Sequence, residues 1–280
     1  MFETTDIQLP DGRALRVYDT HPGARDRLAV LWHHGTPNVG QPPEPLFAAA
    51  ERLGLRWISY DRPGYGGSSR RLGRDLASAA GDAAAAADAL GVGRFAVFGH
   101  SGGSNHALAC AAQLPDRVAG VVSVAALAPF GAAGLDWFAG MYPGGEAELR
   151  ASVAGRAELE RCLAEGKYDR EMFTPDDHAA LAGRWRWLAT VAGLAMEGGL
   201  DGMVDDDLSY VAPWGFELAD ITAPVLLLHG GADRIVPAGH GRWLADQLRA
   251  TCWTRAEDGH LSVLTEGDRA LAWLAESAHG

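Results

Sequence analysis

The chain has 280 residues and 48% of them are hydrophobic, so it can bury a sizeable core. Its formal net charge of −12 at pH 7 argues against nucleic acid or an anionic membrane as a partner, because both bind basic surfaces. Its three widely spaced cysteines, without a Cys-x-x-Cys motif, are typical of free thiols and not of a disulfide framework or a zinc site.

The first half of the chain alternates between strand-like and helix-like patterns. The turn signal Pro10-Asp11-Gly12 predicts a hairpin between two short strands. The later strand-like runs are continuously apolar, as in a parallel sheet that helices cover on both faces. Strands are predicted at 7–9, 14–18, 28–33, 55–60, 95–98 and 118–126, and helices at 45–53, 74–90 and 104–113.

The pattern changes between about Pro129 and Gly215. Strand-like runs stop there, and residues 146–166 and 176–195 are predicted to be helical. Four of the nine tryptophans and four of the five methionines lie in this segment.

The alternation of strands and helices resumes near Pro224 and continues to the end of the chain. Strands are predicted at 224–228 and 251–255, and helices at 238–249 and from 261 to about 277. We therefore predict one α/β core, made of residues 1–128 and 217–280, that is interrupted by a helical cap at 129–216.

A serine lies where the strand at 95–98 meets the helix at 104–113, in the motif Gly99-x-Ser101-x-Gly103. A sharp strand–turn–helix needs small residues on both sides of its apex, because the two backbones approach closely. The helix also directs backbone N–H groups at the apex, where they could stabilise an oxyanion. The pattern predicts a nucleophilic serine; the alternative is a structural turn serine.

A serine nucleophile needs a general base, and the base needs an acid to orient it. Asp233 follows the strand at 224–228, and His260 follows the strand at 251–255. Because the carboxyl ends of parallel strands share one edge of a sheet, these side chains and Ser101 can converge there. Asp233 could instead cap the next helix, and His260 could simply begin one.

Two further loops accompany these residues. One strand ends in His34-Gly35, and the next is followed by Asp61-Arg-Pro-Gly-Tyr-Gly-Gly-Ser68. With these motifs in this order, nearly the whole chain resembles the capped α/β-hydrolase-fold serine hydrolases, which include proline-iminopeptidase-like, epoxide-hydrolase-like and carbon–carbon bond hydrolase relatives. The resemblance implies an α/β fold with a mostly parallel sheet of about eight strands, flanked by helices and carrying a helical cap.

The resemblance also implies the role of each motif residue. Ser101 would be the nucleophile, His260 the general base and Asp233 the orienting acid. The backbone N–H groups of Gly102 and Thr36 would form the oxyanion hole. No metal or organic cofactor is implied.

The leading hypothesis is a hydrolase of small carboxylic esters or related acyl compounds. Relatives that open epoxides or displace halide carry an aspartate nucleophile, so Ser101 argues against those reactions. Peptidase relatives usually read His-Gly-Gly-Pro-Gly, and the His-Gly-Thr-Pro-Asn of residues 34–38 argues against iminopeptidase activity. Cleavage of a carbon–carbon bond, a thioester or an amide, a lyase reaction, and a slow-turnover small-molecule receptor remain open.

The predicted cap leaves two interpretations open. Trp137, Trp185, Trp187 and Trp214 could line the substrate pocket, or they could form the core of the cap itself. The acidic run 201–207 is interpreted as a solvated loop, with binding of a cationic group as the alternative.

The remaining histidines and the Asp-Arg-Pro-Gly loop are interpreted as scaffold. His34 is expected to hold the oxyanion loop together by hydrogen bonds and not to take part directly in catalysis. His100 is expected to point to the side opposite the nucleophile, where it packs or forms a hydrogen bond. Arg62 and Tyr65 are expected to support their loop and not to contact substrate. His33, His106 and His240 are interpreted as structural, since no group of residues has metal-ligand spacing.

The first residues lack a basic and then apolar leader pattern, and the run 118–129 falls short of the ~18 residues of a membrane span. We therefore expect a cytoplasmic protein with a small-molecule substrate and with neither nucleic acid nor a membrane as partner. Abundant arginine and alanine beside a single lysine indicate a bacterial source. The oligomeric state is not predicted.

Overall fold

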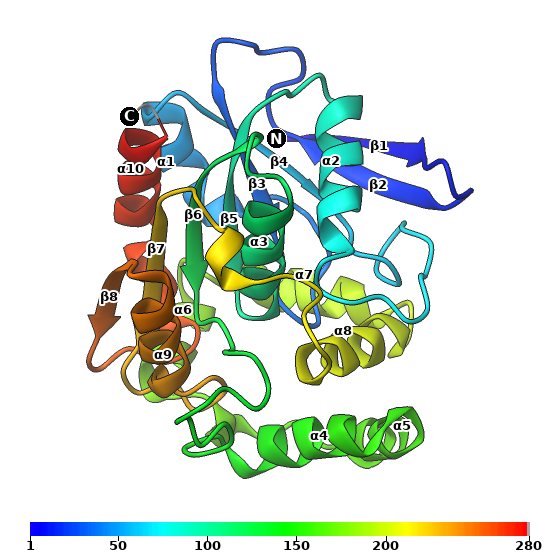
Figure 1. The fold of residues 1–280 in the computed structure, drawn as a ribbon, viewed down its shortest axis with the longest axis vertical. Coiled ribbons are helices and arrows are strands. Elements are labelled where there is room, and N and C mark those ends of the chain that lie inside the picture. Colours follow the sequence, from blue (N-terminus) through cyan, green and yellow to red (C-terminus); the bar gives the residue numbers. More distant parts are fainter. Residues whose placement is uncertain (279–280) are drawn as a thin grey trace.

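A single eight-stranded sheet organises the computed structural model, which describes residues 1–278 (Figure 1). The strand order is β1-β2-β4-β3-β5-β6-β7-β8, with β1, β2 and β4 paired antiparallel and all other pairs parallel. This confirms the predicted α/β fold. The strands are β1 (Glu3–Gln8), β2 (Ala14–Asp19), β3 (Leu28–His33), β4 (Leu55–Tyr60), β5 (Phe95–His100), β6 (Val118–Val124), β7 (Val225–Gly230) and β8 (Thr251–Arg255).

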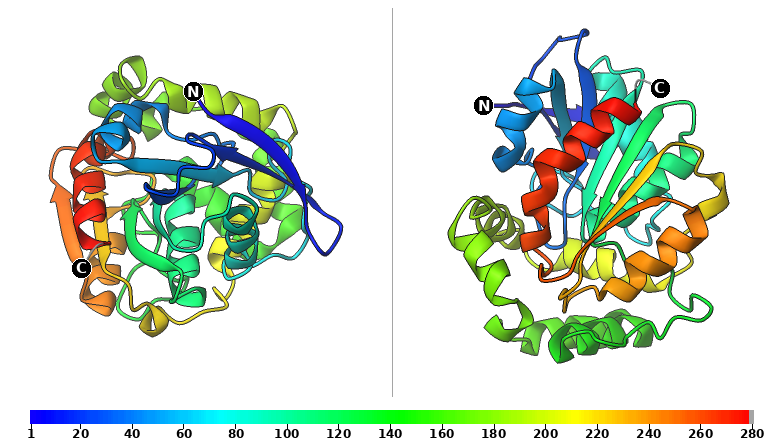
Figure 2. Two further views of the ribbon diagram at one scale, coloured as in Figure 1. Left: turned by 90° about the horizontal axis from the view of Figure 1, so that it is seen from above. Right: turned by 90° about the vertical axis from the view of Figure 1, so that its left-hand side faces the viewer.

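Helices cover both faces of the sheet (Figure 2). One face packs on α2 (Ala79–Ala89), α3 (Gly102–Gln113) and α9 (Ala238–Leu248). The other face packs on α1 (Phe47–Arg52) and α10 (Gly267–Ser277). Because both faces are covered, every residue of β4, β5, β6 and β7 is buried, which explains their continuous apolar runs. Four short 3₁₀ turns complete the described structure: η1 (Glu44–Leu46), η2 (Arg170–Met172), η3 (Leu218–Asp220) and η4 (Ser262–Glu266).

The helix predicted over 74–90 begins only at Ala79. The Asp75 carboxylate accepts a hydrogen bond from the Ser78 backbone N–H at 2.9 Å, and the Ser78 hydroxyl donates to the Asp75 carbonyl. These local bonds hold a turn in place of the first helical turn.

Five helices lie between β6 and β7, in the segment predicted as a helical cap. They are α4 (Pro143–Ala154), α5 (Arg156–Glu165), α6 (Pro175–Ala182), α7 (Trp187–Met196) and α8 (Asp201–Val211). In Figure 1, α4 and α5 lie at one end of the molecule, beyond the carboxyl ends of the parallel strands. A small cluster of Ala151, Leu159 and Val204 joins α4, α5 and α8.

The predicted division into a core of 1–128 and 217–280 and a cap of 129–216 stays a prediction. The helical segment makes a small cluster of its own, yet α6 and α7 also pack into the main core beside α1 and α10. None of the helices described between residues 1 and 278 has the length and apolar character needed to cross a bilayer.

The acidic run 201–207 is part of a buried helix, and its interpretation as a solvated loop is wrong. Asp205 is 3% exposed and Asp206 is fully buried. Asp206 forms ion pairs with Arg62 and Arg74, at 2.7 Å each. These arginines lie more than a hundred residues earlier in the chain, so the local sequence did not reveal that the charges are compensated.

Candidate active site

Ser101 lies at the turn between β5 and α3, as predicted. Its backbone has φ 55° and ψ −132°, a conformation that costs free energy in a residue other than glycine and that recurs at functional sites. A Cβ on Gly99 would overlap the backbone of Gly103, and a Cβ on Gly103 would overlap the carbonyl of His33. The two glycines therefore provide the close approach that this turn requires.

Asp233 and His260 meet at the carboxyl edge of the sheet. Asp233 follows β7, His260 follows β8, and the His260 Nδ1 lies 2.8 Å from the Asp233 Oδ2. The other Asp233 oxygen accepts hydrogen bonds from the backbone N–H groups of Ile235 and Val236, at 2.8 and 2.9 Å. The carboxylate is thus held on one side by its own loop and directs the second oxygen at the imidazole.

The surroundings of His260 favour its charged form. Burial by itself lowers the pKa of the imidazole, but the charge and hydrogen bond of Asp233 outweigh burial and raise the pKa above its ordinary value of 6.5. An imidazole that gains a proton readily, beside a fixed carboxylate, is suited to act as a general base near neutral pH.

His100 connects the Ser101 turn to the His260 loop. Its Nε2 lies 3.0 Å from the His260 carbonyl oxygen, and the two imidazole rings are 5.0 Å apart. Burial lowers the pKa of His100 to about 3, so the ring stays neutral and can donate this bond. His100 therefore forms a hydrogen bond beside the site, which is one of the two roles that the sequence left open.

Thr36 follows β3 and lies beside Gly102, the first residue of α3. A Cβ on Gly102 would come within 2.9 Å of the Thr36 hydroxyl oxygen. The two residues predicted for the oxyanion hole are therefore neighbours, at the N-terminus of a twelve-residue helix.

The family follows from a comparison with known proteins. A model described as alpha/beta hydrolase fold matches residues 29–267. The chain belongs to the alpha/beta hydrolase fold family. The resemblance that the motifs indicated is thus confirmed.

Relatives of this alpha/beta hydrolase differ in their named activities. The chain is 29% identical over 250 residues to a non-heme chloroperoxidase of Streptomyces lividans. The match covers 85% of this chain and 86% of that protein. It resembles the solved enol-lactonase of Burkholderia xenovorans (TM-score 0.74, 18% identity, 99% and 100% coverage). It also resembles a thermophilic esterase of Thermogutta terrifontis (TM-score 0.69, 22% identity, 99% and 100% coverage). At such identities the two solved structures show a shared fold.

In this alpha/beta hydrolase, Arg62 holds the loop that follows β3 and carries Thr36. Its guanidinium donates to the carbonyls of His34 and Gly35 and, at 3.1 Å, to the Thr36 hydroxyl. The His34 Nε2 accepts a hydrogen bond from the Arg62 backbone N–H at 3.0 Å. Arg62 is 1% exposed, so it supports the loop, as expected.

Residues of α8 complete this network, and the sequence did not indicate them. The Thr36 hydroxyl donates to the Asp206 carboxylate at 2.7 Å, and the Tyr210 and Thr36 hydroxyl oxygens are 2.7 Å apart. The Tyr65 hydroxyl also donates to Asp206, at 2.8 Å. Burial by itself raises the pKa of the Asp206 carboxyl, but the Arg62 charge helps to hold it well below its ordinary value. A helix in a segment that the sequence analysis interpreted as a solvated loop thus holds the Thr36 loop in place.

The four tryptophans proposed for substrate contact are all buried among apolar side chains. Trp137 and Trp214 belong to the cluster on the α2, α3 and α9 face, and Trp185 and Trp187 belong to the cluster on the other face. Each is 7% exposed or less. The four side chains thus pack in the two main clusters and not in the small cluster of α4, α5 and α8, and contact with substrate stays a prediction.

His33, His106 and His240 are structural, as interpreted from the sequence. The His33 Nε2 lies 3.4 Å from the Cys110 thiol, and the His106 Nδ1 lies 2.8 Å from the Gly102 carbonyl oxygen. His240 accepts a hydrogen bond from the Ala128 N–H at 3.0 Å. All three rings are buried.

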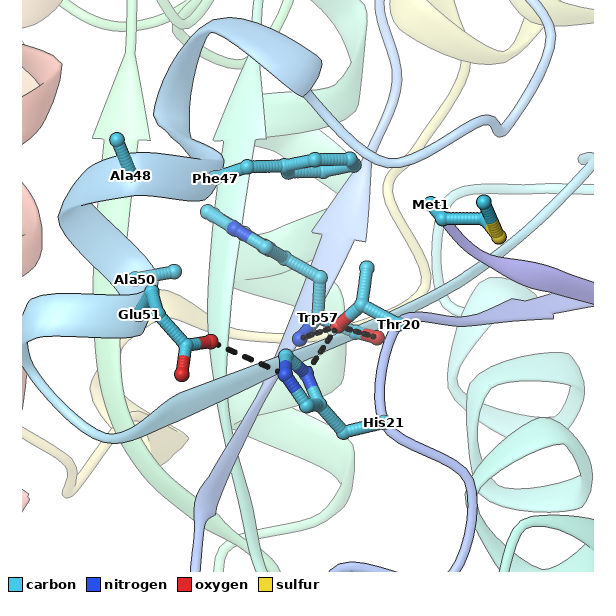
Figure 3. Close-up of a pocket in the computed structure, with 8 residues that line it drawn as sticks. All are labelled: Met1, Thr20, His21, Phe47, Ala48, Ala50, Glu51 and Trp57. Carbon is cyan, nitrogen blue, oxygen red and sulfur yellow. Dashed lines mark hydrogen bonds and ion pairs between the residues drawn. The ribbon is translucent and has the colours of Figure 1, made fainter.

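A surface hollow lies elsewhere, between α1 and the amino-terminal half of β4 (Figure 3). Phe47 and Trp57 line it, and His21 contacts both Thr20 and Glu51 at its rim. None of the predicted site residues borders this hollow.

Proposed function

We propose that this alpha/beta hydrolase is a serine hydrolase that cleaves a small-molecule ester or a related acyl compound through an acyl-enzyme. The observation that carries the proposal is the 2.8 Å contact between Asp233 and His260, at the same sheet edge as the strained turn of Ser101. This is the pairing that an activated serine requires.

In the proposed reaction, His260 takes the proton of the Ser101 hydroxyl while the serine oxygen attacks the carbonyl carbon of the substrate. The N–H groups of Gly102 and Thr36 stabilise the oxyanion that forms. His260 then returns the proton to the leaving alcohol, and the acyl group stays on Ser101. Water, deprotonated by His260, then attacks the acyl-enzyme. The bond between Ser101 and the acyl group breaks, His260 returns the proton to the Ser101 oxygen, and the carboxylic acid is released.

The direct test of the nucleophile uses a fluorophosphonate probe on the purified protein. The probe should label the wild type stoichiometrically, and Ser101→Ala should abolish both labelling and ester turnover. Ser104→Ala is the matched control, because that buried serine lies one helical turn away and its hydroxyl donates to the Val124 carbonyl. Persistent labelling of Ser104 or Ser68 in the Ser101→Ala variant would contradict the proposal.

The substrate class is addressed by a panel of compounds on the same preparation. Esters of increasing acyl length, thioesters, lactones and aminoacyl amides would be compared by kcat/KM. The proposal expects the highest values for short or medium esters. A kcat/KM for amides well above that for esters would contradict the proposed ester hydrolase and favour the alternative, an amide hydrolase.

A further inference from the structure

Asp177 lies on the first turn of α6, 83 residues before His260, yet its carboxylate sits within the His260 loop. The Oδ1 accepts hydrogen bonds from the backbone N–H groups of Leu261 and Ser262, both at 2.7 Å. The Oδ2 accepts from the His260 N–H at 3.2 Å and from the Thr174 N–H at 3.0 Å. One buried carboxylate therefore gathers three successive backbone donors of the loop that carries His260.

The carboxylate itself is held firmly. Thr174 and Asp177 form the capping box of α6, in which the Thr174 hydroxyl accepts a hydrogen bond from the Asp177 N–H at 3.1 Å. A Cβ on Gly259 would overlap the Asp177 carboxylate, so the loop passes as close to it as glycine allows. The Gly259 N–H donates to the Ser262 hydroxyl at 2.7 Å and closes the turn.

The charges around His260 come from several elements. Asp233, on the loop after β7, and Asp177, on α6, both favour the charged imidazole. His100 on β5 and His229 on β7 also face this group, and burial lowers the pKa of each. Burial by itself raises the pKa of Asp177, but its backbone donors and the nearby His260 outweigh burial and lower it. Asp177 is thus a fixed negative charge beside the imidazole.

We propose that Asp177 is a positioning residue: from α6 it fixes the backbone of the His260 loop and thereby the placement of His260 relative to Ser101. This inference rests on the proposed serine-hydrolase function. It adds that a helix between β6 and β7 positions the proposed general base. In Asp177→Asn one oxygen becomes an NH2 donor, so the backbone N–H groups that faced this oxygen lose their acceptor and the loop has to shift.

The test compares Asp177→Asn with Asp176→Asn. Asp176 is the neighbouring acid on the same helical turn but is exposed, so the control removes the same charge without touching the loop. Asp177→Asn should lower kcat by about 10- to 100-fold, since a displacement near 1 Å costs up to about 10²-fold, and should leave KM within about twofold. Asp176→Asn should leave both constants unchanged.

The pH profile separates positioning from a general loss of structure. In the wild type, kcat/KM should rise with pH through the pKa of His260, above 6.5, because only the neutral imidazole accepts a proton. A neighbouring anion stabilises the imidazolium, so its removal in Asp177→Asn should lower this pKa and move the rising limb to lower pH. A shifted midpoint with kcat unchanged would mean that Asp177 acts on His260 through its charge alone, and would overturn the positioning role.

Titration of the His260 imidazole by NMR distinguishes this inference from the proposed function, because it needs no turnover. The His260 pKa should fall in Asp177→Asn and stay constant in Asp176→Asn, even if the Ser101 labelling experiment fails. If labelling succeeds but Asp177→Asn changes neither the titration nor kcat, only the role of Asp177 is refuted.

A measurement on the unmodified protein covers the case in which Asp177→Asn does not fold. The backbone N–H groups of Leu261 and Ser262 should exchange with solvent deuterium far more slowly than unstructured amides, because they donate to a buried carboxylate. Exchange at the unprotected rate would overturn the proposal.

Discussion

The contact between Asp233 and His260 determines which imidazole nitrogen carries the proton. The Nδ1–H donates to the carboxylate, so the Nε2 is left free to accept the proton of a serine hydroxyl. Because Ile235 and Val236 hold the other carboxylate oxygen, Asp233 cannot rotate without losing two hydrogen bonds. The orientation and the tautomer of the His260 imidazole thus depend on the Asp233 side chain.

Asp233→Asn should therefore lower kcat by about 10⁴-fold without unfolding the protein, because the amide favours the wrong imidazole tautomer. Steady-state kinetics on the best ester of the panel, with circular dichroism as the check on folding, measure this. Asp258→Asn is the control, since that acid lies two residues before His260 and is the next candidate in sequence. A loss below tenfold in Asp233→Asn would place the acid elsewhere.

At the scale of elements, ion pairs and hydrogen bonds of Asp206 hold α8 against the loops that follow β3 and β4. Asp206 is fully buried and contacts Arg62, Arg74, Thr36 and Tyr65. Removal of one member of such a buried network leaves the others uncompensated, which is far more costly than the loss of an exposed ion pair.

Asp206→Asn should lower the free energy of unfolding by about 3–5 kcal/mol, because two arginines lose their buried counter-charge. The matched control is Asp201→Asn on the same helix, whose exposed pair with Arg70 should contribute about 0–1 kcal/mol. Urea unfolding followed by fluorescence compares them. Equal stabilities of the two variants would mean that the Asp206 network does not anchor α8.

At the scale of the whole molecule, the segment between β6 and β7 is joined to the core by large aromatic side chains. The Trp187 ring packs against Trp32 of β3, with centroids 6.2 Å apart, and the Trp137 indole N–H donates to the Ala128 carbonyl at 2.8 Å. If this segment covers Ser101 as the predicted cap, it would exclude water from the site and restrict substrates to small or medium size.

Single alanine replacements of Trp137, Trp185, Trp187 and Trp214 test the lining hypothesis. Each should destabilise the protein by about 3–5 kcal/mol, as expected for a buried large side chain. At least one should also change the ratio of kcat/KM between short and bulky acyl esters. Phenylalanine variants serve as controls that keep most of the apolar volume. If all four alanine variants lose stability and keep the parental ratio, the tryptophans serve only as core residues and the lining hypothesis is wrong.

The sequence by itself determined the elements and the order of the site residues. β3 and β4 lie where their apolar runs predicted them, and β8 lies at the predicted residues 251–255. The turn around Ser101 follows from two glycines between a strand and a helix. These signals are local, because hydrophobic period and turn chemistry depend on neighbouring residues. The approach of Asp233 to His260 followed as well, since parallel strands bring their carboxyl ends to one edge.

Only the tertiary structure decided what the acidic residues between β6 and β7 do. A local pattern treats Asp206 as a charge that needs water, and burial is possible only because Arg62, 144 positions away, compensates it. The capping box of Thr174 and Asp177 marks the start of a helix in the sequence, but its second partner, the His260 loop, is 83 residues distant. The free energy of a buried charge is set by the partners that surround it in space, and the chain reveals those partners only once it is folded.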